Sequence, residues 1–229
     1  MGQAAAWTKL YADVVGCGLC RRLVAYREQV ARAKRRAYRD WEYWGKPLPG
    51  FGDRAARLVI IGLAPAAHGG NRTGRMFTGD RSGDWLYATL HQFGFANQPT
   101  STGRDDGLRL TDAYVSAAAR CAPPDNKPTV AEFANCRPFL QRELELLRHK
   151  RVIVALGRVA FDAYLAARRA SGHAVPDRRP RFAHGAVFQL PDVALIASYH
   201  PSQRNTQTGF LTTPMFDKIF ATARRLLSE

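Results

Sequence analysis

Hydrophobic residues along this chain gather into four short apolar runs, which are separated by longer stretches of mixed polarity. The runs lie at 58–61 (LVII), 113–118 (AYVSAA), 151–156 (RVIVAL) and 193–198 (VALIAS). A short apolar run bounded by turn residues is typical of a strand buried on both faces. Because these runs alternate with helical stretches, we predict an α/β fold whose mostly parallel sheet is covered on both faces.

Apolar residues recur at helical spacing in the stretches between the strands. Helices are expected over 21–43, 85–93, 129–149, 158–170 and from 213 onward, after a helical or irregular lead-in at 4–15. Thr129, with Glu132 three residues later, has the spacing of a capping box. Residues 45–52 are predicted to form a linker, 182–190 a weak strand and 203–209 a polar loop. No internal repeat is present, so a single domain is expected.

The first strand leads into a loop at 62–84 that contains six glycines. Connections in α/β domains usually take about two to six residues, and a much longer loop is usually functional. Glycine allows the backbone to approach a ligand closely. Phe77, Asp80 and Asp84 add an aromatic ring and two carboxylates to this loop. We therefore predict a ligand site at the carboxyl end of the first strand.

Polar side chains also follow the second and the fourth strand. Asn126 lies in a proline-rich loop after the second strand, and His200 comes directly after the fourth. The carboxyl ends of parallel strands share one edge of a sheet, so these groups are expected to converge with Phe77 and Asp80. The ring can stack on a flat ligand, the carboxylate can orient water or stabilise a cation, and the imidazole can hydrogen-bond a developing anion.

Each of these four residues also has a purely structural interpretation. Phe77 fits a place in the core, Asp80 fits a helix cap, Asn126 fits a turn, and His200 fits a satisfied histidine at a strand end. Their convergence at one sheet edge is what favours a functional site.

Composition narrows the class of protein. An apolar fraction of 46% is enough for a core, and no apolar run reaches transmembrane length. The first ten residues lack the apolar region of a signal peptide, so we expect an intracellular, cytoplasmic protein with no membrane partner.

The net charge is +15, from 34 Lys and Arg against 19 Asp and Glu. Basic clusters at 21–22, 32–39 and 178–181 favour a polyanionic partner, nucleic acid first, although a solvated basic surface also fits.

Four cysteines give a second signal. Cys17 and Cys20 form a C-x-x-C pair, and Cys121 and Cys136 stand far downstream with fourteen residues between them. In an intracellular protein, metal or redox use is expected more often than a disulfide. Four thiolates suit either Zn²⁺ or a [4Fe–4S] cluster. The open second pair favours the cluster, while zinc and four unrelated buried cysteines stay open as alternatives.

Taken together, these motifs resemble one known family. The stretches GLAPAAHGGNRTGRMFTGDRSGDWL, RCAPPDNKP and SYHPSQRNTQTGFLT, with the cysteine pattern, are similar to the iron–sulfur uracil-DNA glycosylases of the family 5 (type B) branch. The resemblance extends from Cys17 to about Thr213. It implies a three-layer α/β/α sandwich around a mostly parallel four-stranded sheet. It also implies one domain over residues 1–229, whose N-terminal helical extension is tied on by a [4Fe–4S] cluster bound to Cys17, Cys20, Cys121 and Cys136.

The resemblance also implies roles for individual residues. Asp80 would be the catalytic carboxylate, His200 would contact a uracil carbonyl, and Asn126 would be a further catalytic candidate. The base would be bound by Gly62, Leu63, Ala64, Pro65, Ala66, Phe77 and Ala117, with Phe77 stacked on it. The segment 203–211 would enter the DNA where the nucleotide is extruded, through Gln203, Arg204, Asn205, Phe210 and Leu211.

Two positions depart from other uracil glycosylases and are shared with the family 5 branch. Ala64 stands where the best-known uracil enzymes have their catalytic Asp, and Ala117 stands where a related thermophile branch has an asparagine that reads the uracil edge. Both departures imply weaker discrimination between bases. We therefore expect hypoxanthine and other deaminated bases as additional substrates.

The function implied is that of a DNA repair glycosylase. Such an enzyme flips its target base out of the stack and hydrolyses the N-glycosidic bond, leaving an abasic site without strand cleavage. A monomer is expected, because one face would clamp the DNA. Two alternatives stay open: an enzyme for another damaged base or nucleotide, and a non-catalytic iron–sulfur or zinc nucleic-acid-binding module. The second leaves Phe77, Asp80 and His200 without a role.

Overall fold

Six strands form one central sheet in residues 2–175 and 180–229, which are the residues that the computed structural model describes. Their order across the sheet is β1-β3-β2-β4-β6-β5. The four central strands are parallel, namely β3 (Ala113–Ala117), β2 (Leu58–Gly62), β4 (Val152–Leu156) and β6 (Ala194–Ser198). They coincide with the four apolar runs, so the predicted α/β fold with a mostly parallel sheet is confirmed.

Two short antiparallel strands extend this sheet at its edges. β1 (Phe51–Gly52) pairs with β3, and β5 (Val187–Gln189) pairs with β6. The sheet therefore has six strands, two more than the four that the resemblance implied. β1 has only two residues and lies in the predicted linker, where no periodicity can reveal a strand. β5 covers three residues of the predicted weak strand at 182–190, and its largely exposed side chains explain the weak pattern.

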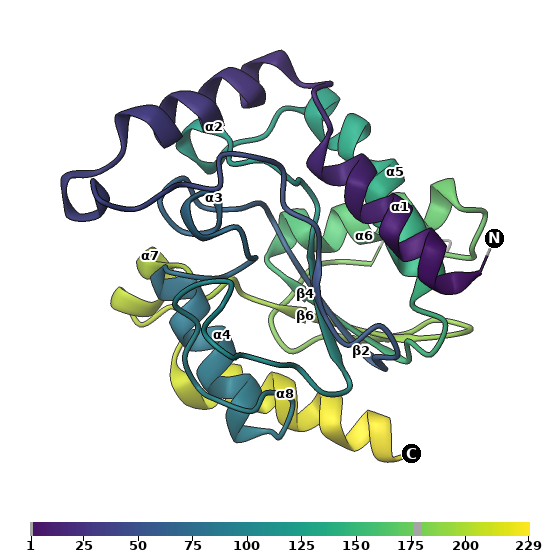
Figure 1. Ribbon diagram of the computed structural model, residues 1–229. Coiled ribbons are helices and arrows are strands. Elements are labelled where there is room, and N and C mark those ends of the chain that lie inside the picture. Colours follow the sequence, from purple (N-terminus) through teal and green to yellow (C-terminus); the bar gives the residue numbers. More distant parts are fainter. Residues whose placement is uncertain (1, 176–179) are drawn as a thin grey trace.

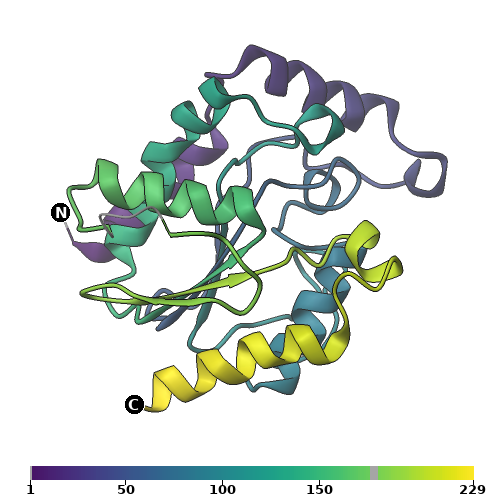
Figure 2. The same cartoon turned by 180° about the vertical axis from the view of Figure 1, so that it is seen from behind.

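Helices cover both faces of the sheet. The helical segments are α1 (Gln3–Val15), α2 (Arg21–Ala33), η1 (Arg36–Tyr38), α3 (Gly70–Thr73), α4 (Arg81–Gln92), η2 (Pro124–Asn126), α5 (Val130–Leu146), α6 (Arg158–Ala170), α7 (Gln203–Gln207) and α8 (Thr213–Ser228). α1, α5 and α6 lie on one face, and α4 and α8 lie on the other (Figures 1 and 2). This arrangement is the three-layer α/β/α sandwich that the resemblance implied. Among the described helices, none combines the length and the apolar character needed to span a membrane.

The alternation of side chains along the parallel strands divides the interior into two cores. In β2, Leu58 and Ile60 pack on the side of α4 and α8, whereas Val59 and Ile61 pack on the side of α1, α5 and α6. All four side chains are fully buried. Burying one such side chain is worth about 1.5–3 kcal/mol, so a single strand fastens both helical layers to the sheet.

Several of the predicted boundaries are wrong. The helix expected over 21–43 ends at Ala33, because Lys34 takes a left-handed φ of 53° and the chain turns away. The helix after the glycine loop begins at Arg81, four residues earlier than expected, because a side-chain cap starts it there. The predicted polar loop at 203–209 contains the short helix α7.

α5 begins with the predicted capping box. The Thr129 hydroxyl accepts a hydrogen bond from the Glu132 backbone N–H at 3.3 Å, and the Glu132 carboxylate accepts one from the Thr129 N–H at 2.7 Å. Two otherwise orphaned donors of the helix end are thereby satisfied. The helix ends at Leu146, three residues before the predicted end.

A buried ion pair joins the segment after β3 to α5. The Arg120 and Glu143 side chains are 1% and 2% exposed, and Arg120 Nη2 lies 2.6 Å from Glu143 Oε2. The same carboxylate accepts hydrogen bonds from the hydroxyls of Tyr114 and Ser116 and from the Gly50 backbone N–H. The Arg120 carbonyl in turn accepts the Leu48 N–H at 2.7 Å. The pair therefore fastens the segment before β1 to the sheet and to the helix behind it.

Replacing Glu143 by Ala should lower the free energy of unfolding by about 3–5 kcal/mol, because it leaves a buried guanidinium without its counter-ion. Urea unfolding followed by circular dichroism measures this loss. The matched control is Glu145→Ala, on an exposed position of the same helix, which should change stability by less than about 0.5 kcal/mol. Equal effects of the two substitutions would contradict the role of the pair.

Candidate active site

Phe77 contacts residues at the carboxyl ends of β2 and β6, the two strands on either side of β4. Its ring stacks on the His200 imidazole, with the centroids 5.7 Å apart and the planes at 27°. The ring also lies directly on Gly62, the last residue of β2, where an added Cβ would stand only 2.6 Å from two ring carbons. Gly83 in α4 packs even more closely on the Phe77 carbonyl oxygen, which would stand 1.8 Å from an added Cβ. The two glycines therefore let the loop fold tightly back on the strand end.

Asp80 is the N-cap residue of α4. One carboxylate oxygen accepts the Gly83 N–H at 3.0 Å, and the other lies against the Cα of Gly69, with no room for a side chain at that glycine. Burial raises the pKa of Asp80 and the charge of Asp84 adds to this, against the opposing effects of the Gly83 and Ser82 N–H groups. The helix-cap interpretation of Asp80 is thus confirmed, and the cap fixes the carboxylate beside the Phe77 loop.

His200 follows the carboxyl end of β6 directly. Burial lowers the pKa of His200 to about 4, so the imidazole is neutral at physiological pH. Gly157, directly after β4, lies next to the His200 side chain, and Asn205 Nδ2 donates to the His200 carbonyl at 2.9 Å. In the described part of the chain, no hydrogen bond engages the imidazole ring. A neutral imidazole can donate one N–H to a ligand carbonyl.

The predicted base-binding loop continues directly from β2. The backbone N–H groups of Ala118 and Ala119 donate to the carbonyls of Gly62 and Leu63, each at 2.9 Å, so β3 supports the start of this loop. Ala117 pairs with Gly62 in register and is 1% exposed. The rest of the loop then leads into α3. Pro65 is buried, whereas Ala64 and Ala66 are half-buried. The Ala66 carbonyl accepts hydrogen bonds from two backbone N–H groups.

Asn126, the fourth residue predicted to converge at the site, lies exposed in the loop after β3. It lies in the single turn η2 with a left-handed φ of 55°, and its side chain is exposed. In the described residues its side chain makes no hydrogen bond. The structure therefore brings Gly62, Phe77 and His200 into contact and holds Asp80 as a helix cap three residues after Phe77. Within the described residues, the exposed Asn126 side chain makes no hydrogen bond to any of them.

The predicted DNA-entering segment contains exposed and buried residues. In α7, Gln203 and Arg204 are exposed and Asn205 is half-buried, and Phe210 is 53% exposed. Leu211 is fully buried in the core beside α8, so its side chain anchors the segment and is not available to DNA. Phe210 is thus the large apolar side chain of this segment that can reach a ligand.

Phe210 ends a stack of three rings. It lies on Tyr199, with centroids 4.3 Å apart, and Tyr199 lies on His184, with centroids 4.8 Å apart. The Tyr199 backbone N–H donates to His184 Nδ1 at 3.0 Å. The exposed ring is therefore held by the residue that precedes His200, and its position is tied to the end of β6.

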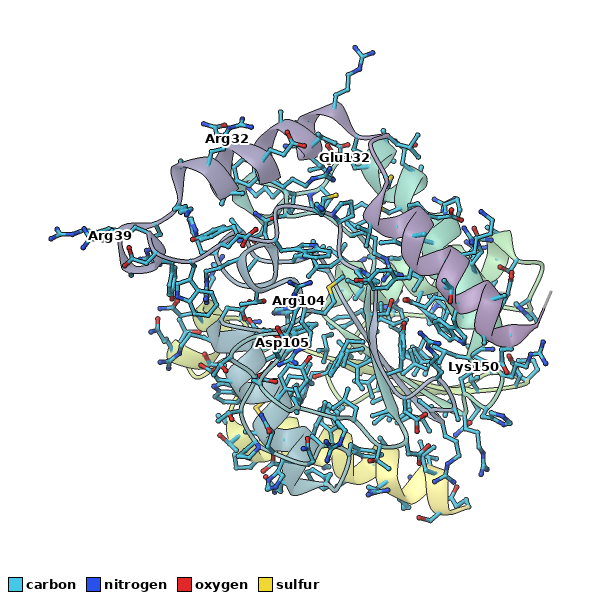
Figure 3. All side chains as sticks on the ribbon, in the orientation of Figure 1. Arg32, Arg39, Arg104, Asp105, Glu132 and Lys150 are labelled. Atoms are coloured by element: carbon cyan, nitrogen blue, oxygen red, sulfur yellow. The ribbon has the colours of Figure 1, made fainter. Side chains whose placement is uncertain are left out.

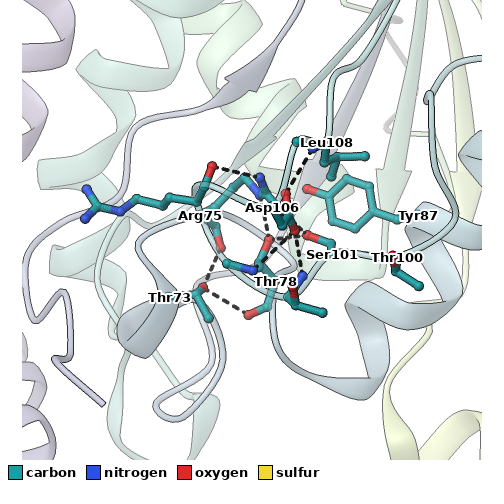
Figure 4. A network of polar contacts seen from close by, with 12 residues as sticks. Thr73, Arg75, Thr78, Tyr87, Thr100, Ser101, Asp106 and Leu108 are labelled. Atoms are coloured by element: carbon teal, nitrogen blue, oxygen red, sulfur yellow. Dashed lines mark hydrogen bonds and ion pairs between the residues drawn. The ribbon is translucent and has the colours of Figure 1, made fainter.

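A buried polar network, which the sequence did not reveal, holds the loop that carries Phe77. Arg75 reaches Asp106 at 2.5 Å and the Ser101 hydroxyl at 2.7 Å, and Thr78 bonds to the same hydroxyl (Figure 4). Although burial alone would raise the pKa of Asp106, Arg75 and three backbone N–H groups hold it well below the usual range. No sequence signal indicated this pairing, because Asp106 lies in a polar, glycine-rich turn thirty-one residues away.

The four cysteines lie around one small cavity between α2, the loop after β3, and α5. Arg27, Arg120 and Asn135 also line it. Cys121 and Cys136 are buried, and Cys17 and Cys20 are half-buried. Arg27 Nη1 donates to Cys121 Sγ at 3.1 Å, and Asn135 Nδ2 donates to Cys20 Sγ at 3.4 Å. The sequence-predicted set of four cysteines thus meets at one place.

The state of His200 gives a pH prediction. The imidazole should stay neutral at about pH 5.5, one unit below the ordinary histidine pKa, and should titrate near pH 4. Because the unfolded chain binds this proton more readily than the folded one, the contribution of His200 to stability is complete above about pH 6.5 and falls as the pH drops toward 4. Nitrogen-15 NMR of the histidine rings measures the titration, and a His200→Gln variant assigns the signal. Titration of His200 near pH 6.5 would contradict the buried, uncharged site.

Comparison with known proteins identifies the family. Residues 49–224 match the model of the uracil DNA glycosylase superfamily. A type-5 uracil-DNA glycosylase of Mycobacterium bovis is 51% identical over 227 residues, covering 98% of this chain and 83% of that protein. One of Thermus thermophilus is 50% identical over 216 residues, covering 93% and 94%. A type-4 uracil-DNA glycosylase of Thermotoga maritima is 32% identical over 123 residues, covering 53% and 56%. The chain therefore belongs to the uracil-DNA glycosylase superfamily, in the same branch as the type-5 proteins.

Proposed function

We propose that this chain excises uracil from DNA, acting as a cytoplasmic monomer that flips the nucleotide out and hydrolyses its N-glycosidic bond. The observation that carries the proposal is the stacking of the Phe77 ring on a neutral His200 at the carboxyl edge of the sheet, with the Asp80 carboxylate held as a helix cap three residues after Phe77. Its membership of the uracil-DNA glycosylase superfamily gives this arrangement its substrate. The product is an abasic site.

The three side chains suit the charge changes of this reaction. Breaking the bond leaves a cationic, oxocarbenium-like sugar and an anionic base. His200, as a neutral imidazole, donates its one N–H to the base carbonyl on which negative charge develops. Asp80 stabilises the cationic sugar and orients the attacking water. Phe77 offers its ring as a stacking surface for the extruded base.

The arrangement favours hydrolysis without strand cleavage. Strand cleavage by a glycosylase needs an amine nucleophile, such as a lysine, that forms a Schiff base with the sugar. The residues that meet at this sheet edge offer a ring, a carboxylate and an imidazole, with no lysine among Gly62 to Asp84. We therefore assign a monofunctional hydrolase.

The substrate range follows from two small residues. Ala117 at the end of β3 and Ala64 in the loop carry only methyl groups, which form no hydrogen bond with a base edge. A site that does not pair with the edge of its substrate discriminates weakly against related bases. Hypoxanthine and other deaminated bases are therefore proposed as further substrates.

We also assign a [4Fe–4S] cluster to Cys17, Cys20, Cys121 and Cys136. In the described residues, no three His, Cys, Asp or Glu side chains are placed to hold one metal ion. The four sulfurs line one shared cavity, and four cysteine thiolates are the donor set that holds a [4Fe–4S] cluster. Arg27 Nε and Arg120 Nε are buried without a partner beside them, and both can face the negative charge of four thiolates.

The position of this cavity indicates a structural role for the cluster. Cys17 and Cys20 lie in the connection from α1 to α2, while Cys121 follows β3 and Cys136 lies in α5. When bound, the cluster supplies a cross-link between these segments. The residues assigned to base excision lie on other segments, so no step of the reaction is assigned to it.

A non-catalytic nucleic-acid-binding module remains the second candidate, because the net charge and the cysteines fit it as well. The observation against it is the site itself: a binding module has no need of a neutral imidazole and a capped carboxylate fixed at one edge of the sheet. Release of the base distinguishes the two.

Substituting Asp80 by Asn should slow uracil release from a duplex by at least about a hundredfold, the scale of losing a general base, while DNA binding changes little. Asn can still cap α4, so the fold is preserved. The matched control is Asp84→Asn, an exposed carboxylate one turn further along the same helix. Single-turnover assays measure both variants. A near-normal rate for Asp80→Asn, or an equal loss for Asp84→Asn, would remove Asp80 from its role.

Purified protein should absorb visible light and contain about four iron atoms per chain, the content of one [4Fe–4S] cluster. Replacing Cys136 by Ser should abolish the absorbance and lower the thermal midpoint, because the cross-link to α5 is lost. Iron and sulfide analysis with a melting curve makes both measurements. One zinc atom and no iron in the native protein would contradict the cluster.

A further inference from the structure

The segment that the sequence predicted as the end of a long helix forms an arm. We use this name for residues 34–46, which follow α2 and include η1. In Figures 1 and 2 the arm projects from the same side of the molecule as α7, the short helix in the segment that carries Phe210. The arm and α7 therefore flank the side on which the site lies.

The arm is basic and its charges are free to meet a partner. It holds five basic and two acidic side chains, a net charge of +3. Arg35, Arg36 and Arg39 are exposed, and Figure 3 shows Arg39 pointing away from the body of the protein. The ion pair between Arg39 and Asp40 spans 3.8 Å between side chains that are 75% and 92% exposed, so it neutralises little.

The buried Arg72 side chain holds the arm against the active-site loop. The Arg72 guanidinium lies between the rings of Tyr38 and Trp41, at 3.9 and 4.1 Å from their centroids. The same side chain donates to the carbonyls of His68 and Gly79, at 2.8 and 3.0 Å, and Gly79 directly precedes Asp80. The arm is thus packed on the loop that carries the assigned catalytic carboxylate.

Further contacts at the base of the arm support this placement. The Tyr43 hydroxyl lies 3.0 Å from His68 Nδ1, and the backbone N–H of Trp44 donates to the Arg72 carbonyl at 3.0 Å. A surface fixed in this way loses little conformational freedom when it binds, which favours affinity.

The inner side of the arm has a different character. A cleft of about 570 Å³ separates the arm from residues 102–106. Its wall holds equal numbers of acidic and basic side chains, namely Glu42, Asp105, Asp106, Lys46, Arg72 and Arg104, so these charges balance. Arg35, Arg36 and Arg39 do not line this cleft. The side suited to an anion is therefore the outer one.

We propose that the outer side of the arm, through Arg35, Arg36 and Arg39, binds backbone phosphates of the DNA beside the extruded nucleotide. The proposal rests on the proposed function, which makes DNA the partner. Arginine suits this task, because its guanidinium matches the geometry of a phosphate and stays charged at all relevant pH values. Such contacts position the duplex and carry no base sequence information.

The test compares two triple variants in their binding of an undamaged duplex over a series of salt concentrations. One variant is Arg35→Gln, Arg36→Gln, Arg39→Gln. The matched control is Arg148→Gln, Arg151→Gln, Arg169→Gln, which removes the same charge from exposed positions near the amino-terminal edge of the sheet, away from the site. Fluorescence anisotropy gives the association constant, and the slope of its logarithm against the logarithm of salt concentration reports how many phosphates the protein neutralises.

The arm variant should lower the magnitude of this slope by about 0.9 for each phosphate that is no longer neutralised, and by up to about 2.7 for three. The control should change the slope by less than about 0.9, the value for one phosphate. On a uracil duplex at saturating protein, the arm variant should keep its single-turnover rate within about twofold, while half-saturation needs at least about tenfold more protein.

Equal slopes for the arm variant and the control would overturn the proposal. A loss of the saturated rate with an unchanged slope would overturn it as well, since the arm would then support the loop only. A different result would contradict the proposed function, namely wild-type protein that releases no base from any duplex. In that case the salt slopes would still show whether the arm contacts DNA.

Discussion

The contact between the Phe77 ring and the Cα of Gly62 sets the shape of the site. Phe77 adopts a left-handed φ of 52°, a conformation that costs a non-glycine residue roughly 1–3 kcal/mol and persists only when its surroundings fix it. Gly62 beneath the ring, His200 beside it and Gly83 behind its carbonyl supply that fixation. The carboxylate of Asp80, three residues later, is placed as a consequence of this turn.

Two buried arginines hold the same loop from opposite sides. Arg75 fastens it to the 101–108 turn through Asp106, and Arg72 fastens it to the segment after α2 through Tyr38 and Trp41. Each guanidinium is largely removed from water. The cost of burying its charge is therefore offset only because hydrogen bonds, a carboxylate or aromatic rings surround it. The loop is thus long and glycine-rich in sequence yet closely held in space, which suits a site that must bind an extruded base in one orientation.

Patterns that act over a few residues predicted the framework of the fold. The apolar run at 58–61 and the capping box at Thr129 each depend on near neighbours, and both appear in the structure. The turn at Lys34, the pairing of Arg75 with Asp106 and the burial of Leu211 depend on residues far away in the sequence, so no local pattern could reveal them. The same limit applies to the site: the strand ends indicated that Phe77 and His200 would meet, but the exposed position of Asn126 depends on how the proline-rich loop turns.

The central claim is that the site releases a base by hydrolysis. The most direct measurement incubates the protein with an end-labelled duplex carrying one uracil, divides the sample, and treats one half with hot alkali before electrophoresis. The account predicts a cut at the uracil position only in the alkali-treated half, because the enzyme leaves an intact strand with an abasic site. A cut without alkali would contradict the hydrolytic mechanism, and an uncut strand in both halves would contradict base excision altogether.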